Sequence, residues 1–177
     1  SLMCISFEYA NNLISTTRWT GVPLRDLLHL ATPLSGVHDV VFRAADGYSD
    51  SITLAKALEP TTLAVYGMGG EALRHAHGYP CRMYVPNLYG IKNVKWVREI
   101  ELVDFDYRGF WQERAWTDTA EINTIAMLDE PWQDVIRDSD GLVWVVGMAY
   151  AGSRGIGRVE LLVPDEDWRA VDVEPYD

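Results

Sequence analysis

Four cationic side chains lie within one short stretch of this acidic chain and could together hold a small anion. They are His77, Arg82, Lys92 and Lys95. Arginine offers a planar fork that matches phosphate, lysine offers a point charge, and histidine offers a donor that titrates near neutrality. Glycines and prolines alternate with these cations and place them at the margins of turns. Any one of them alone is more typical of a polar turn, but the cluster predicts an anion site.

Two cysteines offer a second kind of chemistry. A thiolate is a soft donor for a transition metal, and Cys4 stands at the end of a short apolar run, just before a polar loop. Residue type alone favours a small buried hydrophobe for both Cys4 and Cys81. A disulfide between them stays open, although no spacing pattern supports it.

The composition limits the class of protein and its partners. The chain has 177 residues, of which 48% are hydrophobic, and its net charge is -11. This is enough for one domain, or for one domain and part of another, with a sizeable core. The acidic balance excludes nucleic acid as a partner, because a binder must neutralise phosphates. No apolar run is long enough to span a membrane, and Ser1 to Cys4 do not resemble a signal peptide, so we expect the chain to begin inside a larger protein.

The residues before position 118 mix strands and short helices without regular alternation. Strands are predicted over 2–7, 37–44, 63–68 and 94–103. A helix is predicted from Leu24 to Leu30, begun by Pro23, and a second over 52–58 behind a cap at Thr53. Asp46 to Ser49 are typical of a turn. The pattern favours an α+β fold rather than a doubly wound sheet.

The pattern of predicted elements changes near residue 118, where we place a domain boundary. Short strands separated by turn residues are predicted over 122–127, 142–150, 157–163 and 168–173. Four strands are too few for a closed sandwich. We therefore expect residues 119–177 to be a truncated all-β segment.

Residues 77–96 resemble a known protein family. Their sequence pattern is H-G-Y-P-x-R-x-x-V-P-x-x-Y-G-x-K-x-V-K-W. It closely resembles the molybdopterin-binding domain of the sulfite oxidase family, which includes bacterial enzymes that reduce S-oxides. Other matching segments are 4–6, 15–28 and 46–49, in the same order. The resemblance implies a molybdopterin-dependent oxidoreductase with a molybdenum-molybdopterin cofactor. It also implies that residues 1–118 form the molybdopterin-binding domain, without its N-terminal part, and that residues 119–177 are part of an immunoglobulin-like dimerisation domain.

The resemblance also assigns roles to individual residues. Cys4 is implied as the single protein ligand to molybdenum. The implied cofactor-binding residues are Cys4, Arg18, Tyr48, Ser49, His77, Arg82, Lys92 and Lys95. The implied catalytic residues are Cys4, Arg18 and Trp116. Taken alone, the same residue types also fit simpler roles: an exposed cation for Arg18, turn residues for Tyr48 and Ser49, and a core residue for Trp116.

Two departures from the family pattern bear on the substrate. Members that oxidise sulfite have a basic segment after the cysteine, whereas residues 5–12 contain no arginine here. Animal sulfite oxidases have a tyrosine in the place of Trp116. An oxyanion loses compensating charge and a hydroxyl donor in such a site. We therefore expect a poor sulfite oxidase that acts on another small S- or N-centred substrate.

These features are compatible with two functions. The first is oxygen-atom transfer to or from a small S- or N-centred molecule, with a separate protein as electron donor or acceptor, because the chain has no haem or flavin motif. The second is a non-catalytic anion-binding or assembly module. The resemblance further implies a homodimer, a membrane anchor outside this chain, and an extracytoplasmic or membrane-associated location.

Overall fold

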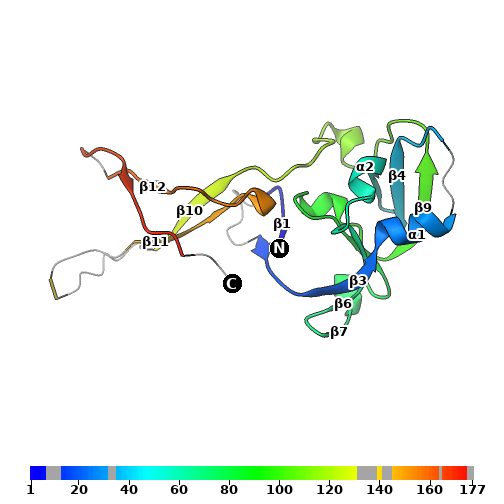
Figure 1. Ribbon diagram of the computed structural model, residues 1–177, viewed down its shortest axis with the longest axis horizontal. Helices are drawn as coiled ribbons and strands as arrows, with labels where there is room; N and C mark the ends of the chain where they lie inside the picture. The colour runs from blue at the N-terminus through cyan, green and yellow to red at the C-terminus, as the bar shows by residue number, and fades with distance from the viewer. Residues whose placement is uncertain (7–12, 32–34, 131–138, 141–144, 164, 175–177) are drawn as a thin grey trace. The chain divides into compact units, whose positions relative to one another are not determined.

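The computed structural model describes residues 1–6, 13–31, 35–130, 139–140, 145–163 and 165–174 (Figure 1). The chain divides into two compact units, Ser1–Ile122 and Asn123–Asp177. Every residue that the sequence assigns to the site belongs to the first unit. None of the described helices is long and apolar enough to cross a membrane.

One antiparallel sheet is built around β6 (Leu63–Met68). Its partners are β3 (Trp19–Pro23), β7 (Glu71–Ala72) and β8 (Arg82–Tyr84). Strands β3 and β6 approach closely at Gly21, where a Cβ atom would lie 2.5 Å from the Ala64 carbonyl oxygen. Helix α1 (Leu24–Ala31) begins directly after Pro23, which confirms the first predicted helix.

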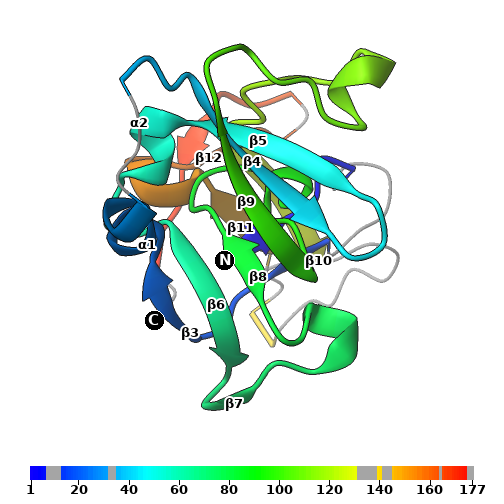
Figure 2. The ribbon, with the colours of Figure 1, turned by 90° about the vertical axis from the view of Figure 1, so that its right-hand side faces the viewer.

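A second antiparallel sheet has β4 (Asp39–Ala44) at its centre, between β5 (Ser49–Thr53) and β9 (Val97–Val103) (Figure 2). The sequence did not predict β5. The turn predicted from Asp46 is present, but Ser49, its last predicted residue, already begins β5, and the helix predicted from residue 52 was wrong there. The reason is that β5 buries the polar residues Asp50 and Ser51, so it lacks the apolar alternation of a half-buried strand.

The helix predicted after residue 52 exists, but it starts later. Helix α2 (Leu54–Ala57) follows β5 without a break. The Lys56 N–H donates to Thr53 Oγ1 at 3.3 Å, which confirms the predicted cap.

The apolar core of the first unit joins both sheets and α1. Leu24 of α1, Phe42 of β4 and Met83 of β8 are all 0% exposed and belong to one cluster. Ile52 of β5 and Ala64 of β6 pack into the same cluster. This shared core fixes the strands on which the candidate site residues lie.

Short elements position the remaining site residues. β1 (Leu2–Met3) pairs with β2 (Ile14–Ser15), and Cys4 follows β1 directly. The strand predicted over 2–7 is therefore shorter than expected, and its end at residue 7 lies outside the described residues. The 3₁₀ turns of this unit are η1 (His75–His77), η2 (Gly90–Lys92) and η3 (Gln112–Arg114).

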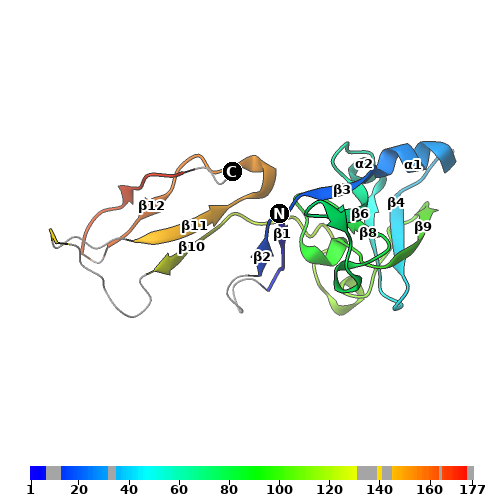
Figure 3. The same ribbon diagram turned by 90° about the horizontal axis from the view of Figure 1, so that it is seen from below.

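The described part of the second unit contains separate antiparallel strand pairs (Figure 3). They are β10 (Ile125–Glu130) with β11 (Val146–Tyr150), and β12 (Glu160–Leu161) with β13 (Arg169–Ala170), and η4 (Gly152–Arg154) follows β11. Each strand overlaps a predicted range, although residues 142–144 of one range lie outside the described residues. The immunoglobulin-like character of this unit stays a prediction.

Candidate functional site

The turn after η1 gathers two of the predicted cations. Gly78 has a φ angle of 107°, which favours glycine, and a Cβ atom there would lie 3.0 Å from Arg82 Cβ and 3.1 Å from Lys95 Cβ. Lys95 Nζ donates to the Ala76 carbonyl oxygen at 3.0 Å, and Arg82 Nη1 donates to that of His77 at 2.9 Å. The His77 side chain is exposed. The structure therefore brings His77, Arg82 and Lys95 together around one turn.

Arg82 is a buried cation that no carboxylate of the described chain balances. It is 6% exposed, and burial lowers its pKa to about 10, so it is charged at neutral pH. Its nitrogens donate to the carbonyl oxygens of His77, Asn93 and Met83, at 2.9, 3.3 and 3.5 Å. A guanidinium has five N–H groups, so donors are left over. An anion bound to them would balance a charge that is costly to bury alone.

Lys92 makes a different contact from the one that the sequence suggested. Its Nζ lies 2.8 Å from Asp50 Oδ1 and 3.6 Å from Asp118 Oδ1. Lys92 is 2% exposed and Asp50 is 0% exposed. A carboxylate of the protein thus balances the charge of Lys92. Its role toward an external anion stays a prediction that these contacts do not support.

A pocket of about 290 Å³ brings together residues from distant parts of the first unit. Three of the predicted site residues line it, namely Cys4, Tyr48 and Lys95. Trp96 and Trp111 add aromatic surface to the same lining. Because Lys95 also flanks the turn that holds Arg82, the pocket lies beside the cation cluster. We take it as the candidate site.

Cys4 is the softest donor in this pocket. It is a free, half-buried cysteine, and its N–H donates to the Leu13 carbonyl oxygen at 2.9 Å, which fixes the chain after β1. The Ser6 N–H donates to Cys4 Sγ at 3.4 Å and places the positive end of a peptide dipole beside the sulfur. Among the described residues, no group of three or more His, Cys, Asp or Glu side chains could hold a metal. Residues 7–12, part of the segment without arginine, lie outside the described residues.

Tyr48 and Ser49 face different surroundings. The Tyr48 hydroxyl lies 3.0 Å from Asp50 Oδ2 and 2.8 Å from the Ile91 carbonyl oxygen. Burial, and then the Asp50 charge, raise the pKa of Tyr48, so the phenol stays protonated and acts as a donor. Ser49 Oγ instead lies 2.8 Å from the Tyr107 hydroxyl. Tyr48 lines the 290 Å³ pocket and Ser49 does not.

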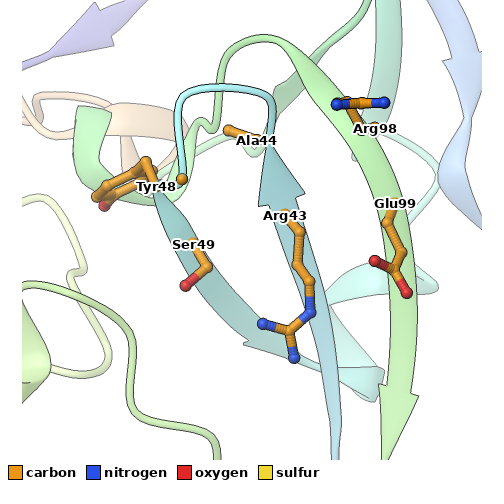
Figure 4. Close-up of a pocket in the computed structure, with 7 residues that line it drawn as sticks. Arg43, Ala44, Tyr48, Ser49, Arg98 and Glu99 are labelled. Carbon is orange, nitrogen blue, oxygen red and sulfur yellow. The ribbon is translucent and has the colours of Figure 1, made fainter.

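A larger hollow of about 590 Å³ lies over the second sheet (Figure 4). Arg43, Ser49 and Glu99 stand on its three neighbouring strands. Arg43 Nη2 lies 2.5 Å from Glu101 Oε2, and this hydrogen bond raises the pKa of Arg43. The described lining has no cysteine, and a carboxylate balances Arg43. Its lining also includes Tyr48 and Ser49, two predicted site residues, and a second cation, Arg98, but the lack of a cysteine distinguishes it from the smaller pocket.

The two predicted catalytic residues other than Cys4 lie outside the pocket lining. The Arg18 side chain is exposed just before β3. Trp116 packs on Trp111, with ring centroids 4.5 Å apart at an interplanar angle of 39°. Because Trp111 lines the pocket, Trp116 contacts one residue of the pocket wall. The catalytic roles of Arg18 and Trp116 stay predictions.

Sequence reasoning missed Asn93, which lines the pocket and shapes its loop. Its Oδ1 accepts from the Val85 N–H at 2.8 Å, and its Nδ2 donates to the carbonyl oxygens of Tyr89 at 3.1 Å and Leu88 at 3.3 Å. The side chain therefore ties the end of β8 to η2. Asn93 lies between Lys92 and Val94 in a segment of mixed polarity, so the local sequence provided no signal for this buried role.

Comparisons with known proteins identify the family. Residues 2–111 match the family described as the oxidoreductase molybdopterin binding domain. The chain belongs to this family. Its predicted place in the sulfite oxidase family is thereby confirmed.

The matches with individual relatives include most of this chain but only part of each relative. The NADH nitrate reductase of Volvox carteri is 32% identical, over 98% of this chain and 25% of its own. The mitochondrial sulfite oxidase of Drosophila melanogaster is 31% identical, over 91% of this chain and 34% of its own. Among solved structures, the sulfane dehydrogenase SoxCD from Paracoccus pantotrophus has the same fold, with a TM-score of 0.77 and 24% identity over 99% of this chain and 48% of that chain. The chain thus spans about a quarter to a third of these two curated relatives.

Proposed function

We propose that this chain binds a molybdenum-pterin cofactor and serves oxygen-atom transfer to or from a small S- or N-centred substrate. The observation that carries the proposal is the shared pocket of Cys4, Tyr48 and Lys95, next to the unbalanced cation Arg82. The relatives support the substrate class, since a nitrate reductase and a sulfite oxidase act at nitrogen and sulfur centres.

The residues present fit the cofactor at both of its ends. Cys4 offers a soft sulfur ligand for molybdenum. Arg82 and Lys95, held around Gly78, offer fixed charges for the pterin phosphate, and His77 stands in the same turn. When bound, the cofactor supplies a redox-active metal that exchanges an oxygen atom with the substrate.

The chain's own part is to hold the cofactor and shape its surroundings. Tyr48 stays protonated and donates its hydroxyl hydrogen within the protein, so it contributes its ring and the hydroxyl oxygen to the pocket wall. Trp96 and Trp111 contribute aromatic surface to the pocket lining. We also propose that a separate protein exchanges electrons with the cofactor.

We further propose that sulfite is a poor substrate. A dianion needs compensating charge in the pocket, and the segment after Cys4 contains no arginine. Trp116 offers an indole N–H where animal sulfite oxidases offer a hydroxyl. Sulfoxides and N-oxides are neutral overall, and they suit an aromatic wall better than sulfite does.

The first test is the cofactor content of protein purified from cells that make molybdopterin. We expect molybdenum and pterin in equal amounts, and loss of the molybdenum in Cys4→Ser. A chain that contains neither group under these conditions would contradict the proposal and favour the non-catalytic anion-binding module.

The second test concerns the substrate of the loaded protein. It compares sulfite with an artificial electron acceptor against sulfoxides and N-oxides with a reduced viologen. We expect reduction of at least one oxide. Rapid sulfite oxidation without reduction of any oxide would overturn the substrate proposal and leave cofactor binding intact.

A further inference from the structure

A buried ion pair and its hydrogen-bond partners connect β5, η2 and η3 next to residues of the pocket lining. Lys92 Nζ, at the end of η2, lies 2.8 Å from Asp50 Oδ1 on β5. Asp50 Oδ2 accepts from the Tyr48 hydroxyl at 3.0 Å and lies 3.4 Å from Gln112 Nε2 of η3. Asp50 is 0% exposed and Lys92 is 2% exposed, so the network is shielded from solvent.

Each member of this network stands next to a residue that lines the 290 Å³ pocket. Ile91 precedes Lys92, Trp111 precedes Gln112, and Tyr48 bonds to Asp50 directly. Ile91, Trp111 and Tyr48 all belong to the pocket lining. The Tyr48 hydroxyl also lies 2.8 Å from the Ile91 carbonyl oxygen, which closes the network on itself. Lys92 and Asp50 are not part of the lining.

We propose that Lys92 and Asp50 are positioning residues of the cofactor pocket, which fix Tyr48, Ile91 and Trp111 relative to one another without touching the ligand. A buried charge whose partner is removed has to recruit water or move toward solvent, because it is costly to leave unpaired. Either movement would displace η2 or η3 and, with them, two walls of the pocket. The nature of the ligand rests on the proposed function, whereas the positioning role does not.

The competing role is the one that the sequence suggested, in which Lys92 binds the anionic end of the ligand. The two roles predict opposite effects for Asp50→Asn. If Lys92 binds the ligand, the loss of Asp50 frees its charge and binding becomes tighter. If the pair positions the walls, the loss of Asp50 leaves Lys92 unpaired and binding becomes weaker, although Asp118 at 3.6 Å softens the effect.

A double-mutant cycle separates these roles. The variants are Lys92→Met, Asp50→Asn and the double variant. The double variant contains no unpaired charge, and its Asn side chain can still accept from the Ser51 N–H, which donates to Asp50 Oδ1 at 2.8 Å in the native chain. Lys56→Met is the matched control. Lys56 of α2 pairs with Glu59 at 2.7 Å, and neither residue lines the pocket.

The first readout needs no cofactor. Near-ultraviolet circular dichroism of the full chain reports the coupling of Trp111 with Trp116, whose ring centroids lie 4.5 Å apart, and Trp116→Phe identifies that signal. We expect each single variant to lose the coupling and to lower the unfolding temperature by roughly 10 °C, and the double variant to recover most of both. Single variants that keep the native signal and unfolding temperature would overturn the positioning role.

The second readout is the affinity for purified, metal-free molybdopterin at several salt concentrations. We expect each single variant to bind about tenfold more weakly and the double variant to bind within about twofold of the native chain, with the salt dependence unchanged throughout. Tighter binding by Asp50→Asn, or a flatter salt dependence in Lys92→Met, would show that Lys92 binds the ligand instead. A native chain that binds no molybdopterin would contradict the proposed function, and the first readout would still decide the role of the pair.

Discussion

The guanidinium carbon of Arg82 lies 5.1 Å from the centre of the Trp19 ring. Trp19 in turn stacks on Tyr84, with ring centroids 5.4 Å apart. Trp19 Nε1 is buried and has no hydrogen-bond partner in the described chain. A buried cation and an unused donor thus share one aromatic stack, and together they could bind an anion.

We predict that Arg82→Ala weakens the retention of molybdopterin. Loss of a charge-assisted hydrogen bond costs about 1.5–3 kcal/mol, or roughly ten- to a hundredfold in affinity. The measurement is pterin content after gel filtration, followed by titration with the free pterin. Arg25→Ala is the control, since Arg25 contacts the exposed Asp26 on α1. Equal retention in the two variants would remove Arg82 from the site.

Cys4→Ser should lose molybdenum while it keeps the pterin. A hydroxyl is a hard and poorly ionised donor for a soft metal site, whereas the cations around Gly78 are unchanged. The metal-to-pterin ratio of the purified variant is the measurement. Cys81→Ala serves as the control because Cys81 packs against the core and does not line the pocket. A normal ratio in Cys4→Ser would show that Cys4 is not needed to hold the molybdenum.

Cys81 should react slowly with alkylating reagents, and its rate should keep rising at high pH. Burial raises the pKa of the Cys81 thiol, so its thiolate fraction in the folded chain is smaller than in the unfolded chain. In Cys4→Ser, where Cys81 is the single thiol, we expect alkylation at pH 8 to be at least about tenfold slower than in urea. The two rates should converge as the pH rises through the folded pKa. Equal rates at pH 8 would show an accessible thiol.

The same shift has a consequence for stability with a definite sign. The unfolded chain loses the thiol proton first, so deprotonation favours unfolding. The neutral thiol contributes its full stability below the unfolded pKa, and this contribution is lost as the pH rises further. Urea titrations at neutral and alkaline pH should therefore show a smaller loss of stability on raising the pH in Cys81→Ala than in the native chain.

Gly21→Ala should destabilise the first unit. A Cβ atom at Gly21 would lie 2.5 Å from the Ala64 carbonyl oxygen and 2.9 Å from Val65 Cα, and both are backbone atoms of the paired strand. Overpacking of this kind costs about 1–3 kcal/mol in the free energy of unfolding. Urea titration is the measurement, and Gly157→Ala is the control because a Cβ there meets nothing within 4 Å. Indistinguishable variants would argue against this strand pairing.

The sequence predicted those parts of the fold whose causes are local. Helix α1 follows from Pro23 and the apolar spacing after it, the Thr53 cap from residue type, and β6 from a continuous apolar run. Arg82 and Lys95 lie within 17 positions of Gly78 in the sequence, which limits how far apart they can be in the fold. These predictions needed no knowledge of distant residues.

The rest depended on partners far away in the chain. Lys92 and Asp50 are separated by 42 positions, so no local pattern showed that the charge of Lys92 was already balanced. Strand β5 was missed for the same reason. Its buried residues Asp50 and Ser51 are polar, and their hydrogen-bond partners include residues far away in the sequence. The sequence singled out Trp116, but the ring packing assigns the pocket wall to Trp111.

The way in which Arg82 is held determines how the pH dependence of activity can be interpreted. Its hydrogen bonds go to backbone carbonyl oxygens, which do not titrate, and its own pKa of about 10 lies above the range of ordinary assays. The charge at the cation cluster contributed by Arg82 is therefore constant across such a titration. A bell-shaped activity profile would report ionisation of the substrate, the cofactor or another side chain, and not a change in how Arg82 binds its anion.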